Sequence, residues 1–88
     1  MKILCVCGVG QGTSLLLKMN VADVMEEKGY SVDVDNTDLT SANGERADLI
    51  VTNSEFSKQI TNQAPIVIVE NYFDKEEIRR KLEEFLNK

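Results

Sequence analysis

The stretch from Lys2 to Leu17, KILCVCGVGQGTSLLL, constrains the fold more than any other part of the chain. The apolar run over residues 3–6 is typical of a buried β-strand, and the segment after Ser14 has the spacing of an amphipathic helix. Between them, glycines alternate with other residues over positions 8–12. Glycines let the backbone approach a ligand closely, and the unpaired N–H groups of a helix N-terminus attract anions. The stretch therefore predicts a strand, an anion-binding loop and a helix in succession.

The predicted loop begins with a thiol. Cys7 ends the predicted strand and faces a ring of N–H donors, which favours the nucleophilic thiolate. We therefore predict that Cys7 is the catalytic residue and accepts a phosphoryl group, the alternative being a small buried core residue. The predicted phosphate-binding residues follow it directly and are Gly8, Val9, Gly10, Gln11, Gly12, Thr13 and Ser14. Thr13 or Ser14 is also the predicted N-cap of the helix.

Neither familiar nucleotide-binding loop fits this pattern. The P-loop needs a lysine after its last glycine, where this chain has Thr13, and the GxGxxG fingerprint is replaced by GxGxG. Cys7, five residues and then Thr13 resemble the Cys-x5-Arg loop of cysteine-dependent phosphatases, with threonine in place of arginine. Arginine would clamp the phosphoryl group bidentately, so its absence argues against efficient hydrolysis. A phosphatase-like enzyme stays an alternative.

The chain contains no histidine, and its cysteines are Cys5 and Cys7. Imidazole therefore cannot act as a base or a phosphocarrier here, and a zinc site is not expected. We expect no metal and no other cofactor. Cys5 lies in the middle of the predicted strand, which favours a role in core packing; a regulatory disulfide with Cys7 is the alternative.

Composition narrows the class of protein. A net charge of −5 argues against a nucleic-acid partner, which would favour a basic surface. No apolar run reaches the roughly 18–20 residues that span a bilayer, and no signal peptide is visible, so we expect a cytoplasmic protein without direct membrane insertion. Residues 1–88 are long enough for one small domain.

Predicted strands and helices alternate along the chain. The predicted strands span residues 2–7, 30–36, 48–53 and 66–69. The predicted helices span residues 14–28, 55–62 and 75–87, and residues 36–45 form a polar loop with room for a short helical turn. Ser54 and Asp74 are the predicted N-caps of the later helices, and Gly29 ends the first. The alternation predicts an α/β fold with a small four-stranded parallel sheet, order 2-1-3-4, and helices on both faces.

Apolar periodicity also predicts which side chains face the core. In the first helix they are Leu17, Val21 and Val24, widened by Leu16, Met19 and Met25. In the last helix they are Ile78, Leu82, Phe85 and Leu86. In the second strand they are Tyr30, Val32 and Val34.

Ligands of open parallel sheets bind at the carboxyl ends of the strands. Asn53, Ser54 and Asn71 lie at or just after the ends of predicted strands, so they are candidate neighbours of the cysteine loop, although polar residues are also ordinary in loops. Tyr72 and Phe73 fall at the same end, either as core or as a docking surface. Lys18, one turn into the first helix, is either a solvated side chain or an anion contact.

The segment ILCVCGVGQGTSLLLKMNV closely resembles the start of the IIB components of the bacterial sugar phosphotransferase system, in particular the ascorbate-type group. Lactose-type and galactitol-type IIB components carry the same cysteine loop in looser form. The resemblance is strong over residues 2–25 and continues collinearly to the end of the chain.

The resemblance implies a phosphocarrier. Cys7 would accept a phosphoryl group from a phosphohistidine of a IIA protein and pass it to a sugar, ascorbate or a related one, held by a membrane IIC component. The phosphoprotein would then meet the inner face of the membrane through IIC. A non-catalytic regulatory binding module is the remaining alternative.

Overall fold

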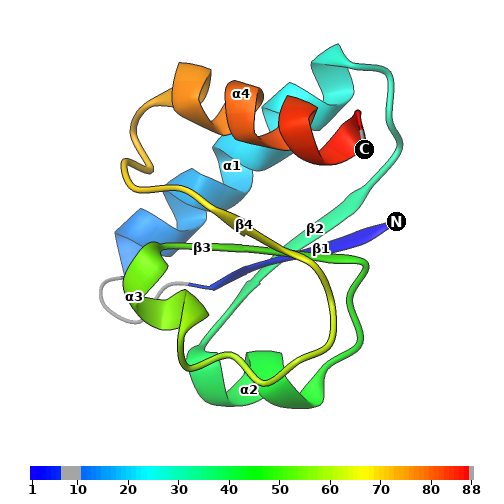
Figure 1. Ribbon diagram of the computed structural model, residues 1–88. Helices are drawn as coiled ribbons and strands as arrows, with labels where there is room; N and C mark the ends of the chain where they lie inside the picture. The colour runs from blue at the N-terminus through cyan, green and yellow to red at the C-terminus, as the bar shows by residue number, and fades with distance from the viewer. Residues whose placement is uncertain (7–10, 88) are drawn as a thin grey trace.

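Four parallel strands form one twisted sheet in the computed structural model, which describes residues 1–6 and 11–87 (Figure 1). The strands are β1 (Lys2–Val6), β2 (Asp33–Thr37), β3 (Leu49–Thr52) and β4 (Ile66–Ile68). Their order is β2-β1-β3-β4, and every neighbouring pair runs parallel. The predicted order 2-1-3-4 is therefore confirmed.

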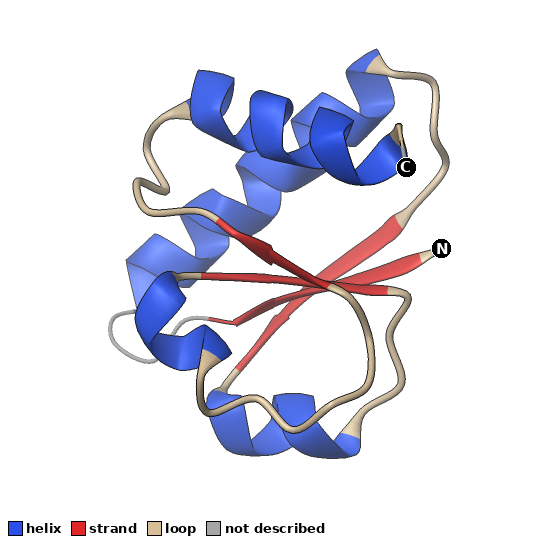
Figure 2. Cartoon of the chain, in the orientation of Figure 1, coloured by secondary structure: helices blue, strands red, loops and turns tan. Residues whose placement is uncertain are grey.

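Helices cover both faces of this sheet, as predicted. They are α1 (Gln11–Glu27), α2 (Leu39–Gly44), α3 (Ser54–Ser57) and α4 (Lys75–Leu86). Figure 2 shows α1 and α4 over one face, with α2 and the short α3 towards the other. The fold is thus an α/β fold of three layers.

Strand β1 lies inside the sheet and has two buried side chains on each face. Ile3 and Cys5 join the core beneath α1 and α4, whereas Leu4 and Val6 join the smaller core beside α2. All of these side chains have no exposed surface. A central parallel strand is covered on both faces, which explains why this segment is a continuous apolar run.

The larger core confirms most of the predicted helical stripes. Leu17, Val21, Val24 and Met25 of α1 and Ile78 and Leu82 of α4 are fully buried. Phe85, Leu86, Val32 and Val34 pack against this core while partly buried. Met19 is 55 % exposed, so its placement in the stripe was wrong. It comes two residues after Leu17, which on a helix is nearly the opposite side.

The start of α1 corrects the predicted cap. The helix begins at Gln11, three residues earlier than predicted, so Thr13 and Ser14 lie inside its first turn. A capping residue flanks the helix with a non-helical backbone, so neither residue is the N-cap. Strand β1 is described as far as Val6, and Cys7, the predicted last strand residue, lies outside the described residues.

The end of α1 explains why β2 starts later than predicted. Gly29 has φ = 82°, a left-handed conformation that suits glycine after a helix. Its N–H donates to the carbonyl of Glu26, and the N–H of Tyr30 donates to Met25, both at 3.0 Å. Tyr30 therefore belongs to the helix end and is 45 % exposed, not part of a buried strand face.

The other helices have polar caps. The Asp74 carboxylate accepts bonds from the N–H groups of Glu76 and Glu77, as predicted for the cap of α4. Helix α2 occupies the predicted polar loop, capped by Asp38, whose carboxylate accepts the N–H of Ser41 at 2.7 Å.

Helix α3 differs from its prediction at both ends. Its N-cap is Asn53, not Ser54, because the side-chain amide oxygen of Asn53 accepts the N–H of Phe56 at 2.8 Å. The helix ends at Ser57 instead of residue 62. Asn62 instead donates to the carbonyl groups of Ala42 and Glu45, and so fixes the chain to the end of α2.

Candidate functional site

The carboxyl ends of all the strands lie at one edge of the sheet, the edge at which α1 begins (Figure 1). Val6 ends β1 there and Gln11 starts α1, which confirms a strand and a helix on the two sides of the predicted loop. The predicted nucleophile and the next loop residues, Cys7, Gly8, Val9 and Gly10, lie outside the described residues. Gln11, Gly12, Thr13 and Ser14 form the first turn of α1.

Thr52 fixes the strand end that leads into the loop. Its buried hydroxyl donates to the carbonyl of Val6 at 3.0 Å, and its own carbonyl accepts the N–H of Val69 at 2.8 Å. The ends of β1, β3 and β4 are thus joined at the candidate site. Sequence reasoning missed this residue, although a hydroxyl at the end of the apolar strand LIVT was a usable signal.

Two of the candidate neighbours bond to their own loops. Asn53 caps α3, and the side-chain amide oxygen of Asn71 accepts the N–H of Phe73 at 3.0 Å. Ser54 is exposed as the first residue of α3. The structure therefore places all of them at the carboxyl edge, with local structural roles for the two asparagine side chains.

The loop between β4 and α4 is held by hydrogen bonds to side chains of both α4 and α1. The Glu77 carboxylate accepts the N–H groups of Glu70 and Asn71, each at 3.0 Å. From α1, the Asn20 amide donates to the carbonyl of Tyr72 at 2.9 Å. Sequence reasoning missed Glu77 and Asn20. An acidic residue three positions after the Asp74 cap is typical of a capping box, which was a signal for Glu77.

Of the two aromatic residues before α4, Tyr72 lies in the core and Phe73 on the surface. Tyr72 is 6 % exposed and belongs to the larger core, whereas Phe73 is 75 % exposed. On α1, Leu15 and Met19 are about half exposed and, four residues apart, share one face of the helix. Exposed apolar side chains therefore lie both on α1 and on the loop before α4, the two segments that the Asn20 hydrogen bond joins.

Cys5 is a core residue and cannot act as a nucleophile at neutral pH. Burial raises the pKa of its thiol to about 12; the nearby charge of Lys18 lowers it and that of Asp35 raises it. The thiol therefore stays protonated, which confirms the predicted role in core packing. Lys18, the candidate anion contact, is half-buried on α1.

The described residues offer no metal site. Over residues 1–6 and 11–87, no three cysteine or acidic side chains gather closely enough to hold an ion. The described helices also include none that is long and apolar enough to cross a bilayer.

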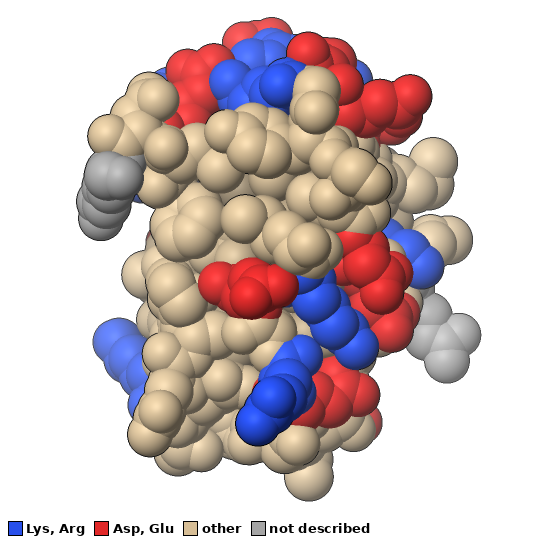
Figure 3. All heavy atoms as spheres, turned by 90° about the vertical axis from the view of Figure 1, so that its right-hand side faces the viewer, with Lys and Arg blue, Asp and Glu red and all other residues tan. Residues whose placement is uncertain are grey.

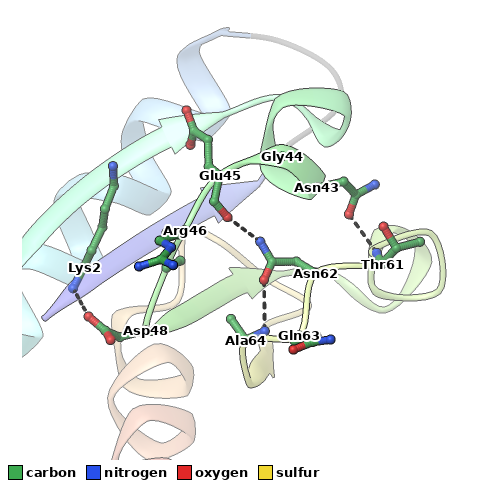
Figure 4. Close-up of a pocket in the computed structure, with 11 residues that line it drawn as sticks. Lys2, Asn43, Gly44, Glu45, Arg46, Asp48, Thr61, Asn62, Gln63 and Ala64 are labelled. Carbon is green, nitrogen blue, oxygen red and sulfur yellow. Dashed lines mark hydrogen bonds between the residues drawn. The ribbon is translucent and has the colours of Figure 1, made fainter.

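A hollow of about 810 Å³ lies at the opposite, amino end of the strands (Figure 4). Its lining is polar and largely bonded to itself: the Lys2 N–H donates to Asp48 at 2.7 Å, and Asn62 donates to the carbonyl of Glu45 at 2.6 Å. Figure 3 shows this side of the molecule with acidic and basic side chains interspersed. This hollow is therefore separate from the predicted cysteine site.

Comparison with known proteins decides the family. The family described as "PTS system, Lactose/Cellobiose specific IIB subunit" matches residues 2–84. The chain belongs to this family. It is a IIB component of a sugar phosphotransferase system, as the resemblance of residues 2–25 indicated.

Two relatives agree with this assignment. The ascorbate-specific PTS system EIIB component of Mycoplasma pneumoniae is 36 % identical over 90 residues, which cover 96 % of this chain and 93 % of the relative. The lactose-specific IIB component domain from Streptococcus pneumoniae matches in structure with a TM-score of 0.62, covering 99 % of this chain and 95 % of that domain. At 16 % identity, the second likeness supports the fold of this IIB component.

Proposed function

We propose that residues 1–88 act as one IIB-type domain that carries a phosphoryl group on Cys7. The observation that supports this most directly is the position of Cys7 in the chain. In the sequence of this IIB-family chain it directly follows Val6, the last residue of β1, and precedes α1; Val6 and the start of α1 lie at the carboxyl edge of the sheet. Ligands of open α/β sheets bind at this edge.

The proposed chemistry has two transfers. In the first, the Cys7 thiolate attacks the phosphorus of a phosphohistidine on a IIA protein; an S–P bond forms, the N–P bond breaks, and the electron pair stays on the imidazole. In the second, a hydroxyl oxygen of a sugar bound by a membrane IIC component attacks the phosphorus. The S–P bond then breaks and regenerates the thiolate, and the hydroxyl proton leaves to solvent.

Phosphoryl transfer depends mainly on positioning and on neutralising the charge of the phosphoryl oxygens. The first N–H groups of α1, over Gln11–Ser14, have no acceptors within the helix and lie at the carboxyl edge. Together with Gly8, Val9 and Gly10 they form the proposed phosphate-binding set. The bond from Thr52 to Val6 holds the strand end from which this set extends.

We propose ascorbate or a related sugar as the acceptor. The relative that carries ascorbate in its name is 36 % identical to nearly the whole chain. Because the sugar is held by IIC, the IIB component works at the cytoplasmic face of the membrane, through contact with IIC.

The test is phosphorylation with phosphoenolpyruvate, the two general carrier proteins and a panel of IIA proteins, followed by intact mass. The wild-type chain should gain one phosphate that maps to Cys7 and is released by iodine. Cys7→Ser should lose this labile phosphate, and the matched variant Cys5→Ala should keep it. Unchanged labelling of Cys7→Ser would contradict the proposal, and turnover of an aryl phosphate by the wild type would favour the phosphatase alternative.

A further inference from the structure

Strand β4 is a lateral edge strand of the sheet, with β3 on one side only. Half of its main-chain groups therefore point away from the sheet. The N–H of Ile50 donates to Pro65 at 2.9 Å, and the N–H of Val69 donates to the carbonyl of Thr52 at 2.8 Å. The C=O group of Pro65 and the N–H group of Val69 therefore point towards β3. Because direction alternates along a strand, the N–H and C=O groups of Ile66 and Ile68 point to the open edge.

A shallow groove of about 520 Å³ runs along this edge. Its floor is the segment from Pro65 to Ile68, and its wall is α4 with Lys81, Glu84 and Phe85. Ile68 is 37 % exposed, and Phe85 is only partly covered. The edge thus combines open main-chain donors and acceptors with apolar side chains, which is a surface suited to adding a strand.

We propose that this edge binds a second copy of the chain, with β4 pairing antiparallel to β4 of the other copy about a two-fold axis at Val67. In that register Ile66 of each copy lies opposite Ile68 of the other copy. Opposed residues of this kind exchange both of their main-chain hydrogen bonds. The outward groups of Ile66 and Ile68 would then all be paired, and the four-stranded sheets would join into one.

Charge on α4 supports a self-complementary contact. Lys81 and Glu84 both line the groove, and neither forms an ion pair with the described residues. A two-fold axis sets the two α4 helices antiparallel on the same face of the joined sheet. Lys81 of one copy can then contact Glu84 of the other, and the two-fold axis repeats that contact with the roles of the copies exchanged.

The opposite edge of the sheet does not offer this match. Strand β2 carries exposed Asp33 and Asp35, so two copies of β2 would bring like charges together. Pairing through β4 also leaves the carboxyl edges of the two copies pointing in opposite directions. The contact would leave both carboxyl edges uncovered, so the dimer is independent of the proposed phosphoryl transfer.

The experiment is sedimentation equilibrium of the full chain over a wide concentration range. Because the contact is small, we expect a reversible dimer with a dissociation constant of roughly 100 µM. Lys81→Glu and Glu84→Lys should each weaken it by about tenfold, since each places like charges opposite one another twice. The double variant K81E/E84K should restore wild-type affinity to within about threefold, because it exchanges the partners without changing their match.

Arg46→Glu is the control for net charge, because Arg46 is exposed in the segment before β3 and does not line the groove. It should dimerise like the wild type. A wild-type chain that stays monomeric at about 1 mM would overturn the proposal, since even weak specific interfaces associate there. A dimer that the double variant fails to restore would overturn it as well. Phosphorylation of Cys7 in the same variants reports separately on the proposed function.

Discussion

The hydroxyl of Thr52 lies 3.0 Å from the carbonyl oxygen of Val6, and the Thr52 side chain is fully buried. Val6 is the last residue of β1, directly before the proposed nucleophile. A bond at this place has two effects: it satisfies polar groups in the interior, and it holds the strand end from which the cysteine loop departs.

Thr52→Val tests this role with little change in side-chain volume. It should lower the free energy of unfolding by about 1–2 kcal/mol, because a buried carbonyl loses its donor. Urea unfolding would measure the loss. Thr61→Val is the matched control, since Thr61 is exposed, and its stability should be within about 0.5 kcal/mol of the wild type. Equal effects of the two substitutions would argue against a structural role for the Thr52 hydroxyl.

Individual residues were predictable where their type and position restrict them. Cys5 could be assigned to the core because it falls in the middle of an apolar strand, and Asp74 could be assigned as a cap because charged residues and a helix follow it. The hydrogen-bond partners of Thr52 and Asn20 could not be predicted, because they are 46 and 52 positions away in the sequence. Tyr72 and Phe73 looked alike until the fold showed which one enters the core.

At the level of elements, types were easier to predict than ends. Helix α1 and β2 were both expected, but the helix end extends through Gly29 to Tyr30, and the strand starts only at Asp33. The reason is that two interpretations of the same residues competed: the alternation at Tyr30, Val32 and Val34 fits a strand, whereas the left-handed Gly29 lets Tyr30 bond back to the helix. Local bonding at the helix end decides between them.

Gly29 and Gly44 provide a matched pair for this element. Gly29→Ala should lower the free energy of unfolding by about 1 kcal/mol, because φ = 82° is unfavourable for a residue with a Cβ atom. Gly44→Ala should be neutral or stabilising by up to about 1 kcal/mol, because Gly44 is helical and an added Cβ would meet nothing within 4 Å. Thermal unfolding of both variants would measure the difference. Equal destabilisation of the two would show that backbone conformation is not the cause.

Across the whole molecule, the topology was predictable and the contacts between distant helices were not. Alternating strands and helices with right-handed crossovers leave few arrangements, and order 2-1-3-4 is one of them. Nothing in the sequence pairs α1 with α4 by charge. The structure shows Lys28 at 2.7 Å from Glu83, and Glu27 between Lys75 at 3.0 Å and Arg79 at 2.8 Å. Such pairs depend on how two helices are placed side by side on the sheet.

Because of these ion pairs, the stability of the fold depends on pH in the acidic range. Hydrogen bonding from Lys75 and then from Arg79 holds the pKa of Glu27 below its ordinary value of 4.5. A carboxyl with a lowered pKa in the folded state stabilises the fold above its ordinary pKa, and this contribution disappears as the pH falls through the folded value. Stability should therefore decrease on acidification below about pH 4.5, and Glu27 should contribute to that decrease.

The variant Glu27→Gln measures how much Glu27 contributes to the loss of stability in acid. The variant has no carboxyl to titrate at that position, so its free energy of unfolding should fall less steeply than that of the wild type between about pH 6 and about pH 3.5. Urea unfolding across that range would give both slopes. Glu26→Gln is the control, because Glu26 is the exposed neighbour and forms no ion pair with the described residues. Because every partner is at least partly exposed, the difference should shrink in concentrated salt, and a difference that salt leaves unchanged would contradict an electrostatic origin.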